Sequence, residues 1–155
     1  MPATSTKAAA AIRPSAPPYS LDDQVGFLLR RAYQRASSNL IERIGAYDLT
    51  APQFATLARL HERGPLSQNL LGRLVAMEPA NIRDVVQRLK RRRLVSTRRD
   101  RGDARLVLVS LTPGGMSLTE ALLPIEIECT ARTLAALNAH EKKLLYDLLG
   151  RLAGS

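Results

Sequence analysis

Apolar residues recur at helical spacing along most of the chain, so the hydrophobic pattern predicts a mainly α-helical protein. The first stripe begins after Ser20, a helix-capping residue type followed by two acidic residues, and ends near Leu49. Its members share one helical face: Leu21, Val25, Leu28, Leu29, Ala32, Ala36, Leu40, Ile44 and Tyr47. No proline interrupts the stretch, so we expect one long helix over about residues 20–49.

Three shorter helices are predicted after this one. Thr50 and Ser67 are the expected N-caps of the first two. Pro79, which follows the break MEPAN, is expected near the first helical position of the third, the fourth helix of the chain. The inner face of this fourth helix is apolar and consists of Ile82, Val85, Val86 and Leu89.

After Leu94 the pattern changes from helical spacing to strand-like alternation. The segment VSTRR, the turn DRGD around Gly102 and the run RLVLVSLT together predict a β-hairpin. Two apolar helices are then expected, the first starting at Thr112 and Pro113 and the last capped by Asn138. The predicted order is four helices, a hairpin and two further helices.

The chain is 155 residues long, a length typical of one domain. Residues 1–18 are rich in Ala, Pro, Ser and Thr, which predicts a disordered tail. Residues 19–155 then form the domain. Within it, helices at about 20–49 and 112–153 bracket a central unit at about 50–111.

Positive charge is concentrated in one part of the chain. The net charge is +9, and residues 73–105, with eleven basic and four acidic residues, contribute +7 of it. Such a run usually meets a polyanion or an anionic membrane, and acidic residues are too sparse here for an ordinary solvated face. A membrane surface is disfavoured because the fourth helix has no Trp or Phe. RNA is disfavoured because the hairpin lacks aromatic residues that stack on unpaired bases.

The third and fourth helices, joined by a tight turn, have the form of a helix-turn-helix, and the hairpin would be its wing. The outer face and flanks of the fourth helix carry small, amide and guanidinium side chains, the types that read base edges in a major groove. These residues are Ala80, Asn81, Arg83, Asp84, Gln87, Arg88 and Arg91. Arg98, Arg99 and Arg101 are expected near the wing tip, which suits a minor groove. The sequence therefore predicts binding to double-stranded DNA.

The stretch GPLSQNLLGRLVAMEPANIRDVVQRLKRRRLV, followed by RRDRGDARLVLVSLTPGG, resembles the winged-helix core of MarR-family transcription regulators. The resemblance covers about residues 20–153. It implies an intertwined homodimer in which the terminal helices of two chains interlock and each chain offers one winged helix to palindromic operator DNA. Most members of this family repress. Many release DNA when a small aromatic acid, for example a nicotinate-like or salicylate-like one, binds between the dimer and DNA-binding lobes.

The resemblance also implies roles for particular residues. Ser67, Gln68 and Asn69 would start the helix that meets the phosphate backbone. The recognition helix would begin with Pro79, Ala80, Asn81, Arg83 and Asp84, with Arg88 further along it. In the wing, the family motif braces the turn by ion pairing between Asp and Arg, and the matching residues are Asp100, Asp103 and Arg105.

Two positions depart from the family pattern. Arg93 stands where a glycine often ends the recognition helix in a left-handed turn. Arg93 then either costs some stability there or lets the helix run slightly further. Gly102 stands where the wing-tip arginine is usual, which leaves Arg101 as the candidate for the minor groove.

The hydrophobic pattern favours a homodimer independently of the resemblance. The terminal helices carry more leucine and isoleucine than one domain of this size needs to cover, and an obligate homodimer buries such a surface. Two recognition helices would then read half-sites about one helical turn apart.

Candidate ligand-binding residues lie on two helices. His61 shares an apolar face with Phe54 and Leu57 near a helix C-terminus, where a cation is favoured. It is either an ordinary core residue or an anion-sensing group in a pocket between the lobes. Further candidates to bind a small carboxylate lie on or just before the first helix, where ordinary surface and interface roles are the alternative. They are Arg31, Tyr33, Gln34, Tyr19 and Ser20.

Catalytic, metal-binding and cofactor-binding motifs find little support in the sequence. The two histidines, His61 and His140, fall in different elements, Cys129 has no zinc-ligand spacing, and no Walker-type glycine loop occurs. We therefore expect no enzyme, no metal and no cofactor. Cys129 is expected to be a small buried residue rather than a redox sensor.

The chain shows no signal-peptide pattern and no long apolar run, so a cytoplasmic protein that does not bind membranes is expected. Two classes of function remain open. The first is a DNA-binding repressor that responds to a ligand. The second is a winged-helix dimer that acts as a protein-interaction module or holds DNA without sensing anything.

Overall fold

The structure, a computed structural model, describes residues 18–154, and it is mainly helical with one small sheet. The tail expected over residues 1–18 thus lies almost entirely outside the described residues. In chain order the elements are η1 (Leu21–Asp23), α1 (Val25–Ile44), η2 (Gly45–Tyr47), α2 (Ala51–Arg63), β1 (Leu66–Ser67), α3 (Gln68–Leu74), α4 (Pro79–Arg91), β2 (Val95–Arg99), β3 (Val107–Leu111), α5 (Pro113–Thr133) and α6 (Ala139–Ala153). The predicted winged helix-turn-helix architecture is confirmed.

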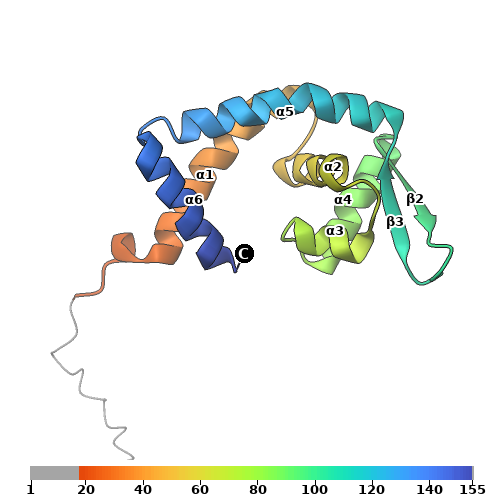
Figure 1. Ribbon diagram of the computed structural model, residues 1–155, viewed down its shortest axis with the longest axis horizontal. Helices are drawn as coiled ribbons and strands as arrows, with labels where there is room; N and C mark the ends of the chain where they lie inside the picture. The colour runs from red at the N-terminus through yellow and green to blue at the C-terminus, as the bar shows by residue number, and fades with distance from the viewer. Residues whose placement is uncertain (1–17, 155) are drawn as a thin grey trace, which may run out of the picture.

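Two lobes are joined by α5, which runs along both of them (Figure 1). Helices α2, α3 and α4 and the sheet form the winged-helix lobe, while α1 and α6 belong to the second lobe at the other end of α5. The sheet is antiparallel in the order β1-β3-β2, and β2 and β3 form the predicted hairpin, with Arg98 opposite Leu108. The two-residue strand β1, which pairs Leu66 with Val109, was not predicted.

The buried core lies chiefly in the winged-helix lobe. The predicted inner face of α4 is confirmed, because Ile82, Val86 and Leu89 are all buried. They belong to one cluster with buried apolar residues of α2, α3, the hairpin and the first half of α5, among them Leu57, Leu60, Leu71, Val95, Val109 and Leu122. Burial of this kind, worth roughly 1.5–3 kcal/mol for each large apolar side chain, holds α4 against its scaffold.

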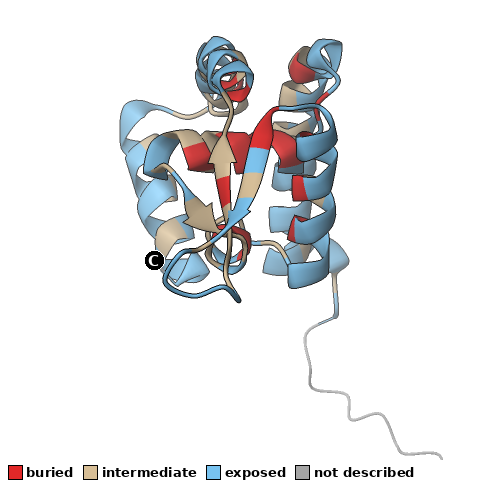
Figure 2. Ribbon diagram, turned by 90° about the vertical axis from the view of Figure 1, so that its right-hand side faces the viewer, coloured by how far each residue is buried: buried red, intermediate tan, exposed pale blue. Residues whose placement is uncertain are grey.

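In Figure 2, where the winged-helix lobe faces the viewer, several buried segments gather in this lobe. By contrast, large apolar side chains of the second lobe are exposed within one chain. Helix α6, all of it in the described range, contains no buried residue although its leucines form a stripe. Val25 on α1 is 64% exposed and Leu152 on α6 is 68% exposed, and several other large apolar side chains of α1 and α6 are exposed as well. So many exposed large apolar side chains are typical of a protein–protein contact.

The first helix is shorter than predicted. Ser20 makes no side-chain cap, and the helix proper begins at Val25 after a 3-10 turn. The reason is local: the Gln24 side chain donates to the Ser20 carbonyl, 2.9 Å away, and Gln24 itself is extended. At the other end, α1 stops at Ile44 rather than Leu49, and a second 3-10 turn leads to Asp48, which has the left-handed φ of 55°.

The other predicted caps are confirmed by their hydrogen bonds. Thr50 and Gln53 form a capping box at the start of α2, with the Gln53 amide donating to Thr50 Oγ1 at 3.4 Å and the Thr50 amide donating to Gln53 Oε1 at 3.0 Å. Asn138 and Glu141 make the same reciprocal pair at the start of α6. Pro79 occupies the first position of α4.

Helix α5 has two features that position the lobes. Thr112 caps it, and the Thr112 hydroxyl also donates to the carbonyl of Arg93 at 2.7 Å, which ties the helix start to the base of the wing. Pro124 lies inside the helix. A proline has no N–H to donate to the carbonyl four residues earlier, here that of Glu120, so the helix is weakened where it passes from one lobe to the other.

Candidate nucleic-acid interface and interlobe pocket

The outer face of α4 is exposed as predicted. Ala80, Asn81, Arg83, Asp84, Gln87, Arg88 and Arg91 are all exposed. Asp84 and Arg88, one helical turn apart, form an ion pair at 2.9 Å. Because Asp84 neutralises part of its charge, Arg88 offers less positive charge to DNA than Arg83 does.

A groove of about 360 Å³ lies between α4, the start of α3 and the wing. Residues from all three elements line it: Gln68, Arg83, Gln87, Thr97, Arg98, Arg99 and Val107. Five of these are predicted contact residues, and their side chains combine two amides with three guanidinium groups. Amide and guanidinium side chains can donate two hydrogen bonds or accept and donate together, which is the chemistry that reads base edges and phosphates.

The other candidates lie around this groove rather than in it. Ser67 is the N-cap of α3, where its hydroxyl accepts from the Leu70 amide at 3.3 Å, and Asn69 is exposed in the first turn beside it. Arg88 and Arg91 line a second hollow of about 460 Å³ near the start of α2. The basic surface thus extends over both sides of α4.

The wing turn is held by backbone amides. Asp100 Oδ1 accepts hydrogen bonds from the amides of Gly102 and Asp103, at 2.8 and 2.9 Å. Both hydrogen bonds lower the pKa of the Asp100 carboxyl, and the bond from the Asp103 amide has the larger effect. Asp103 Oδ1 in turn accepts from the amide of Arg105 at 2.9 Å. The turn is therefore an Asx-type turn in which the carboxylates replace missing ladder bonds.

The ion pairing expected in the wing motif is not present in this turn. Within residues 18–154, neither Asp100 nor Asp103 takes part in a salt bridge. Arg105 and Arg101 are exposed, so both guanidinium groups point to the surface of the wing. Arg99 instead braces the turn by donating to the Ala104 carbonyl at 2.7 Å.

The end of the recognition helix resolves the two alternatives for Arg93. Helix α4 ends at Arg91, and Arg93 adopts the left-handed φ of 57° that a glycine would take more easily. Arg92, which was not among the predicted contact residues, has a structural role. Its guanidinium donates to the carbonyl of Tyr47 at 2.9 Å and to that of Asp48, which fixes the turn between α1 and α2.

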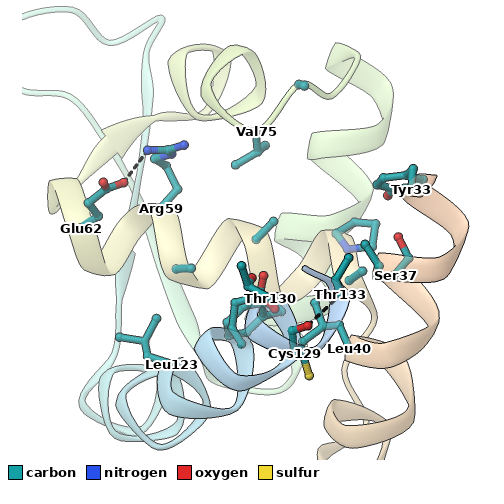
Figure 3. A pocket seen from close by; sticks show the side chains of 18 of the residues that line it. Tyr33, Ser37, Leu40, Arg59, Glu62, Val75, Leu123, Cys129, Thr130 and Thr133 are labelled. Atoms are coloured by element: carbon teal, nitrogen blue, oxygen red, sulfur yellow. Dashed lines mark hydrogen bonds and ion pairs between the residues drawn. The ribbon is translucent and has the colours of Figure 1, made fainter. Parts of the chain in front are cut away.

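A larger cavity of about 950 Å³ lies between the lobes, bounded by α1, α2, α5, α6 and the turn between α3 and α4 (Figure 3). Most of its wall is apolar and includes Leu40, Phe54, Val75 and Leu123. Such a concave, mainly apolar site with a few polar groups is typical of a small-molecule site.

Two of the ligand-binding candidates line this cavity, His61 from α2 and Tyr33 from α1. His61 is partly buried, and its Nε2 lies 3.7 Å from Glu120 Oε1 of α5, so it is neither a core residue nor a solvated one. Arg31, Gln34, Tyr19 and Ser20 do not line the cavity. Arg31 is exposed, lies 3.6 Å from Asp22 and stacks over the ring of Phe27.

Three charged residues of the cavity were missed from the sequence: Arg59, Glu62 and Glu126. Arg59 and Glu62 form an ion pair on α2 (Figure 3). Glu126 lies in the apolar run LLPIEIECT of α5. That run contains two carboxylates, Glu126 and Glu128. Which of them faces a cavity depends on the helices that enclose it, and spacing along one helix does not contain that information.

Polar contacts join α1 to α5 at the cavity wall and beside it. Cys129 is buried as expected and donates to the Asn39 carbonyl at 3.3 Å, and burial raises the pKa of its thiol. Asn39 also donates to Thr133 at 3.2 Å. Arg43 lies 2.7 Å from Glu128, which lowers the pKa of that carboxyl.

Neither a metal-ligand cluster nor a membrane-spanning helix occurs in the part of the chain that the structure describes. No group of three or more metal-ligating side chains is found among residues 18–154. Over the same part of the chain, no helix is long and apolar enough to cross a bilayer.

Comparison with known proteins gives consistent matches. A family model described as the MarR family matches residues 47–106. The HTH-type transcriptional repressor NicR of Pseudomonas putida is 39% identical over 138 residues, which cover 89% of this chain and 87% of NicR.

Solved structures of similar proteins cover almost the whole described fold. A probable transcriptional regulator of Pseudomonas aeruginosa is 45% identical, with a TM-score of 0.79 over 86% of this chain and 99% of that one. BpsR of Bordetella bronchiseptica, whose DNA binding is regulated by 6-hydroxynicotinic acid, is 37% identical, with a TM-score of 0.84 over 90% of this chain and 99% of BpsR. PcaV of Streptomyces coelicolor, solved with its natural ligand, is 31% identical, with a TM-score of 0.80 over 90% and 99% of the two chains.

Proposed function

Because the chain belongs to the MarR family of transcriptional regulators, we propose that it is a homodimeric repressor that releases palindromic operator DNA when a small aromatic or heteroaromatic carboxylic acid binds. As a member of this family it is a transcriptional regulator, not an enzyme. Repression, the operator and the class of effector are the proposed part.

The observation that carries the proposal is the groove between the recognition helix and the wing. Arg83 and Gln87 of α4 and Arg98 of the wing line one groove, together with Gln68 at the start of α3. In a winged-helix dock, α4 would read base edges in the major groove while the wing follows the neighbouring backbone or minor groove. Arg101 and Arg105 at the exposed wing turn, with Arg91 on α4, would extend the contact to further phosphates.

A homodimer is supported by the apolar surface of α1 and α6. Val25, Leu28 and Leu152 are about half to two-thirds exposed in a single chain, and exposing so many large apolar groups to water is costly. Interlocking of the two copies would cover this surface and set the two recognition helices at a fixed separation. That separation is what a palindromic operator requires.

A small-molecule effector is supported by the interlobe cavity. It has the size and the apolar wall of a ligand pocket, and Arg59 and His61 provide cationic or donor groups for a carboxylate. Among the relatives, BpsR is regulated by 6-hydroxynicotinic acid and PcaV has a natural ligand in its solved structure. By analogy with these relatives, an aromatic acid is the class of effector that we propose.

Release of DNA would follow from the position of the cavity. Its wall includes Val75, Ala76 and Met77, which form the turn directly before the recognition helix begins at Pro79. A ligand that packs against this turn would bind one orientation of α4 more tightly than another. An effector changes affinity for DNA only through such a difference between two states.

The test is fluorescence anisotropy on duplex DNA from the region upstream of the protein's own gene, against scrambled duplex, near physiological salt. A specificity ratio of about a thousand or more, lost when aromatic acids are added, would establish the proposed function. Equal, weak and steeply salt-dependent binding to both duplexes would contradict it. That result would favour the alternative, a winged-helix dimer that acts as an interaction or non-sensing DNA-binding module.

A further inference from the structure

One side chain of the interlobe cavity has a chemistry that an aromatic carboxylate alone does not satisfy. Glu126 of α5 lines the cavity, and its Oε2 atom is buried with no hydrogen-bond partner among residues 18–154. Burial raises the pKa of this carboxyl, and neither a nearby charge nor a hydrogen bond contributes to the shift. Native proteins leave few buried polar atoms without a partner, and each one calls for a physical explanation.

The cations near the cavity have other partners. Arg59 is paired with Glu62, and His61 faces Glu120. On the far side of α5, Arg43 and Arg132 are both paired with Glu128. The chain therefore contains a carboxyl oxygen that is sheltered from solvent and turned toward none of these groups. A molecule bound in the cavity can supply the hydrogen-bond donor that the described chain does not.

We propose that Glu126 is a specificity-determining residue that accepts a hydrogen bond from the effector, so that the cavity selects aromatic acids carrying a ring N–H or an O–H group in addition to their carboxylate. This inference rests on the proposed effector-binding function of the cavity. The carboxylate of the acid would meet Arg59 or His61 on α2, and the second polar edge of the ring would meet Glu126 on α5.

Both protonation states of Glu126 suit such a ligand. As a carboxylate it accepts from an N–H or O–H group, and a charge-assisted bond of this kind is stronger than a neutral one. As a neutral acid it can form a reciprocal pair with a lactam, accepting from the ring N–H and donating to the adjacent carbonyl. An acid without a donor would bury the Oε2 atom more deeply and leave it unsatisfied.

Discrimination of this type is strong because an unsatisfied polar group in the site adds to the cost of the wrong ligand. A site built to hydrogen-bond a ligand group rejects the analogue that lacks it far more than an apolar pocket rejects a change in size. We therefore expect wild-type protein to prefer the donor-bearing acid by about tenfold or more.

The experiment measures binding by isothermal titration calorimetry on the full chain with two matched pairs of probes. The first pair is 6-hydroxynicotinic acid and its lactam N-methylated analogue, and the second is 4-hydroxybenzoic acid and 4-methoxybenzoic acid. The proteins are the wild type, Glu126→Leu, Glu126→Gln and Glu42→Gln, the last being the same amide substitution at an exposed carboxylate on α1.

In at least one pair, the wild type and Glu42→Gln should prefer the donor-bearing acid by about tenfold or more, and Glu126→Leu should reduce the preference to within about twofold. Glu126→Gln keeps a carbonyl acceptor and should retain part of the preference, which guards against a leucine variant that fails to fold. If the preference persists in Glu126→Leu, the cavity rejects the analogues because their methyl group is too large. That result would overturn the assignment of Glu126 as the hydrogen-bond acceptor.

Failure of the inference and failure of the proposed function are distinguishable. If wild-type protein binds both members of each pair equally and releases DNA with both, the effector function stands and the role of Glu126 is wrong. If neither pair binds to protein that is active on DNA, the proposal of an aromatic acid effector falls, and the inference falls with it.

Discussion

Gly115 lies so close to Leu94 that a Cβ atom at this position would fall 1.9 Å from the Leu94 carbonyl oxygen. The contact packs the first turn of α5 against the backbone directly before β2. The Thr112 hydroxyl donates a hydrogen bond to the carbonyl of Arg93, the residue before Leu94. The long helix that links the lobes is thus seated on the backbone beside the wing.

We expect Gly115→Ala to destabilise the protein by about 2 kcal/mol or more, because the obstructing atom belongs to the backbone and overpacking of a fixed contact costs 1–3 kcal/mol. The matched control is Gly114→Ala, whose Cβ would meet only the Thr112 hydroxyl at an ordinary 3.8 Å. Thermal unfolding of the two variants checks this prediction. Equal melting temperatures would show that α5 shifts freely at its start.

Asp100→Ala should loosen the wing turn and weaken binding to all DNA sequences several-fold, since it removes the acceptor for two backbone amides. Asp100→Asn keeps an acceptor oxygen and should retain most of the affinity. Hydrogen exchange at the amides of Gly102 and Asp103 reports the turn directly and should quicken only in the alanine variant. Unchanged exchange in Asp100→Ala would contradict the bracing role.

The same carboxyl fixes the pH range of the wing. Its pKa is lowered in the folded protein, so the stabilisation by Asp100 is present above the ordinary aspartate pKa of about 3.9 and is lost only as the pH falls through the lower folded value. Exchange at these two amides should therefore show no transition between pH 5 and 8 once the intrinsic rate is corrected. A transition in that range would mean that the turn depends on another titrating group.

Arg83→Ala should reduce discrimination between operator and scrambled duplex, because Arg83 lies on the exposed face of α4 within the groove. Arg98→Ala should weaken binding to both duplexes about equally. It should also lower the slope of log affinity against log salt by about one. Arg98 is the better phosphate probe than Arg99, whose removal would also delete the bond to the Ala104 carbonyl. Anisotropy over a salt series separates the two effects. If specificity survives Arg83→Ala unchanged, the register of α4 in the major groove is wrong.

Glu126 should make the free energy of unfolding depend on pH in the opposite direction to Asp100. Its folded pKa is raised, so its contribution is fully favourable below the ordinary glutamate pKa of about 4.3 and is lost as the pH rises through the higher folded value. The uncharged Glu126→Gln variant should gain stability relative to the wild type as the pH rises from about 4 to 8. Denaturant unfolding at a series of pH values checks this. A difference independent of pH would show that the carboxyl is not desolvated in the folded state.

Much of the fold could be predicted because its signals are local. Thr50 and Asn138 each begin a helix by bonding an amide three residues later, a geometry that depends only on neighbouring residues. The buried face of α4 followed from spacing alone. By contrast, the predicted start of α1 was wrong because the Gln24 side chain donates to the Ser20 carbonyl. The residue types around Ser20 do not reveal this hydrogen bond.

The sites were harder to predict where several elements meet. The family motif in the wing implied ion pairs, but the aspartates bond backbone amides, and sequence similarity does not distinguish these two ways of holding a turn. In the cavity, His61 was identified from its helix face, whereas Arg59 and Glu126 gain their meaning only when α2 and α5 enclose the same space. Periodicity describes one helix at a time, and a cavity is a property of several.

Leu122 of α5 is fully buried in the core of the winged-helix lobe, although it lies eleven residues beyond the last strand. The DNA-reading module therefore does not end where its wing ends. A chimaera that transplants this module onto another sensor should carry α5 at least through Leu122, and Pro124 offers a junction where the helix already lacks one backbone bond. A cut at Thr112 would remove a wall of the transplanted core and leave the recognition helix on an incomplete scaffold.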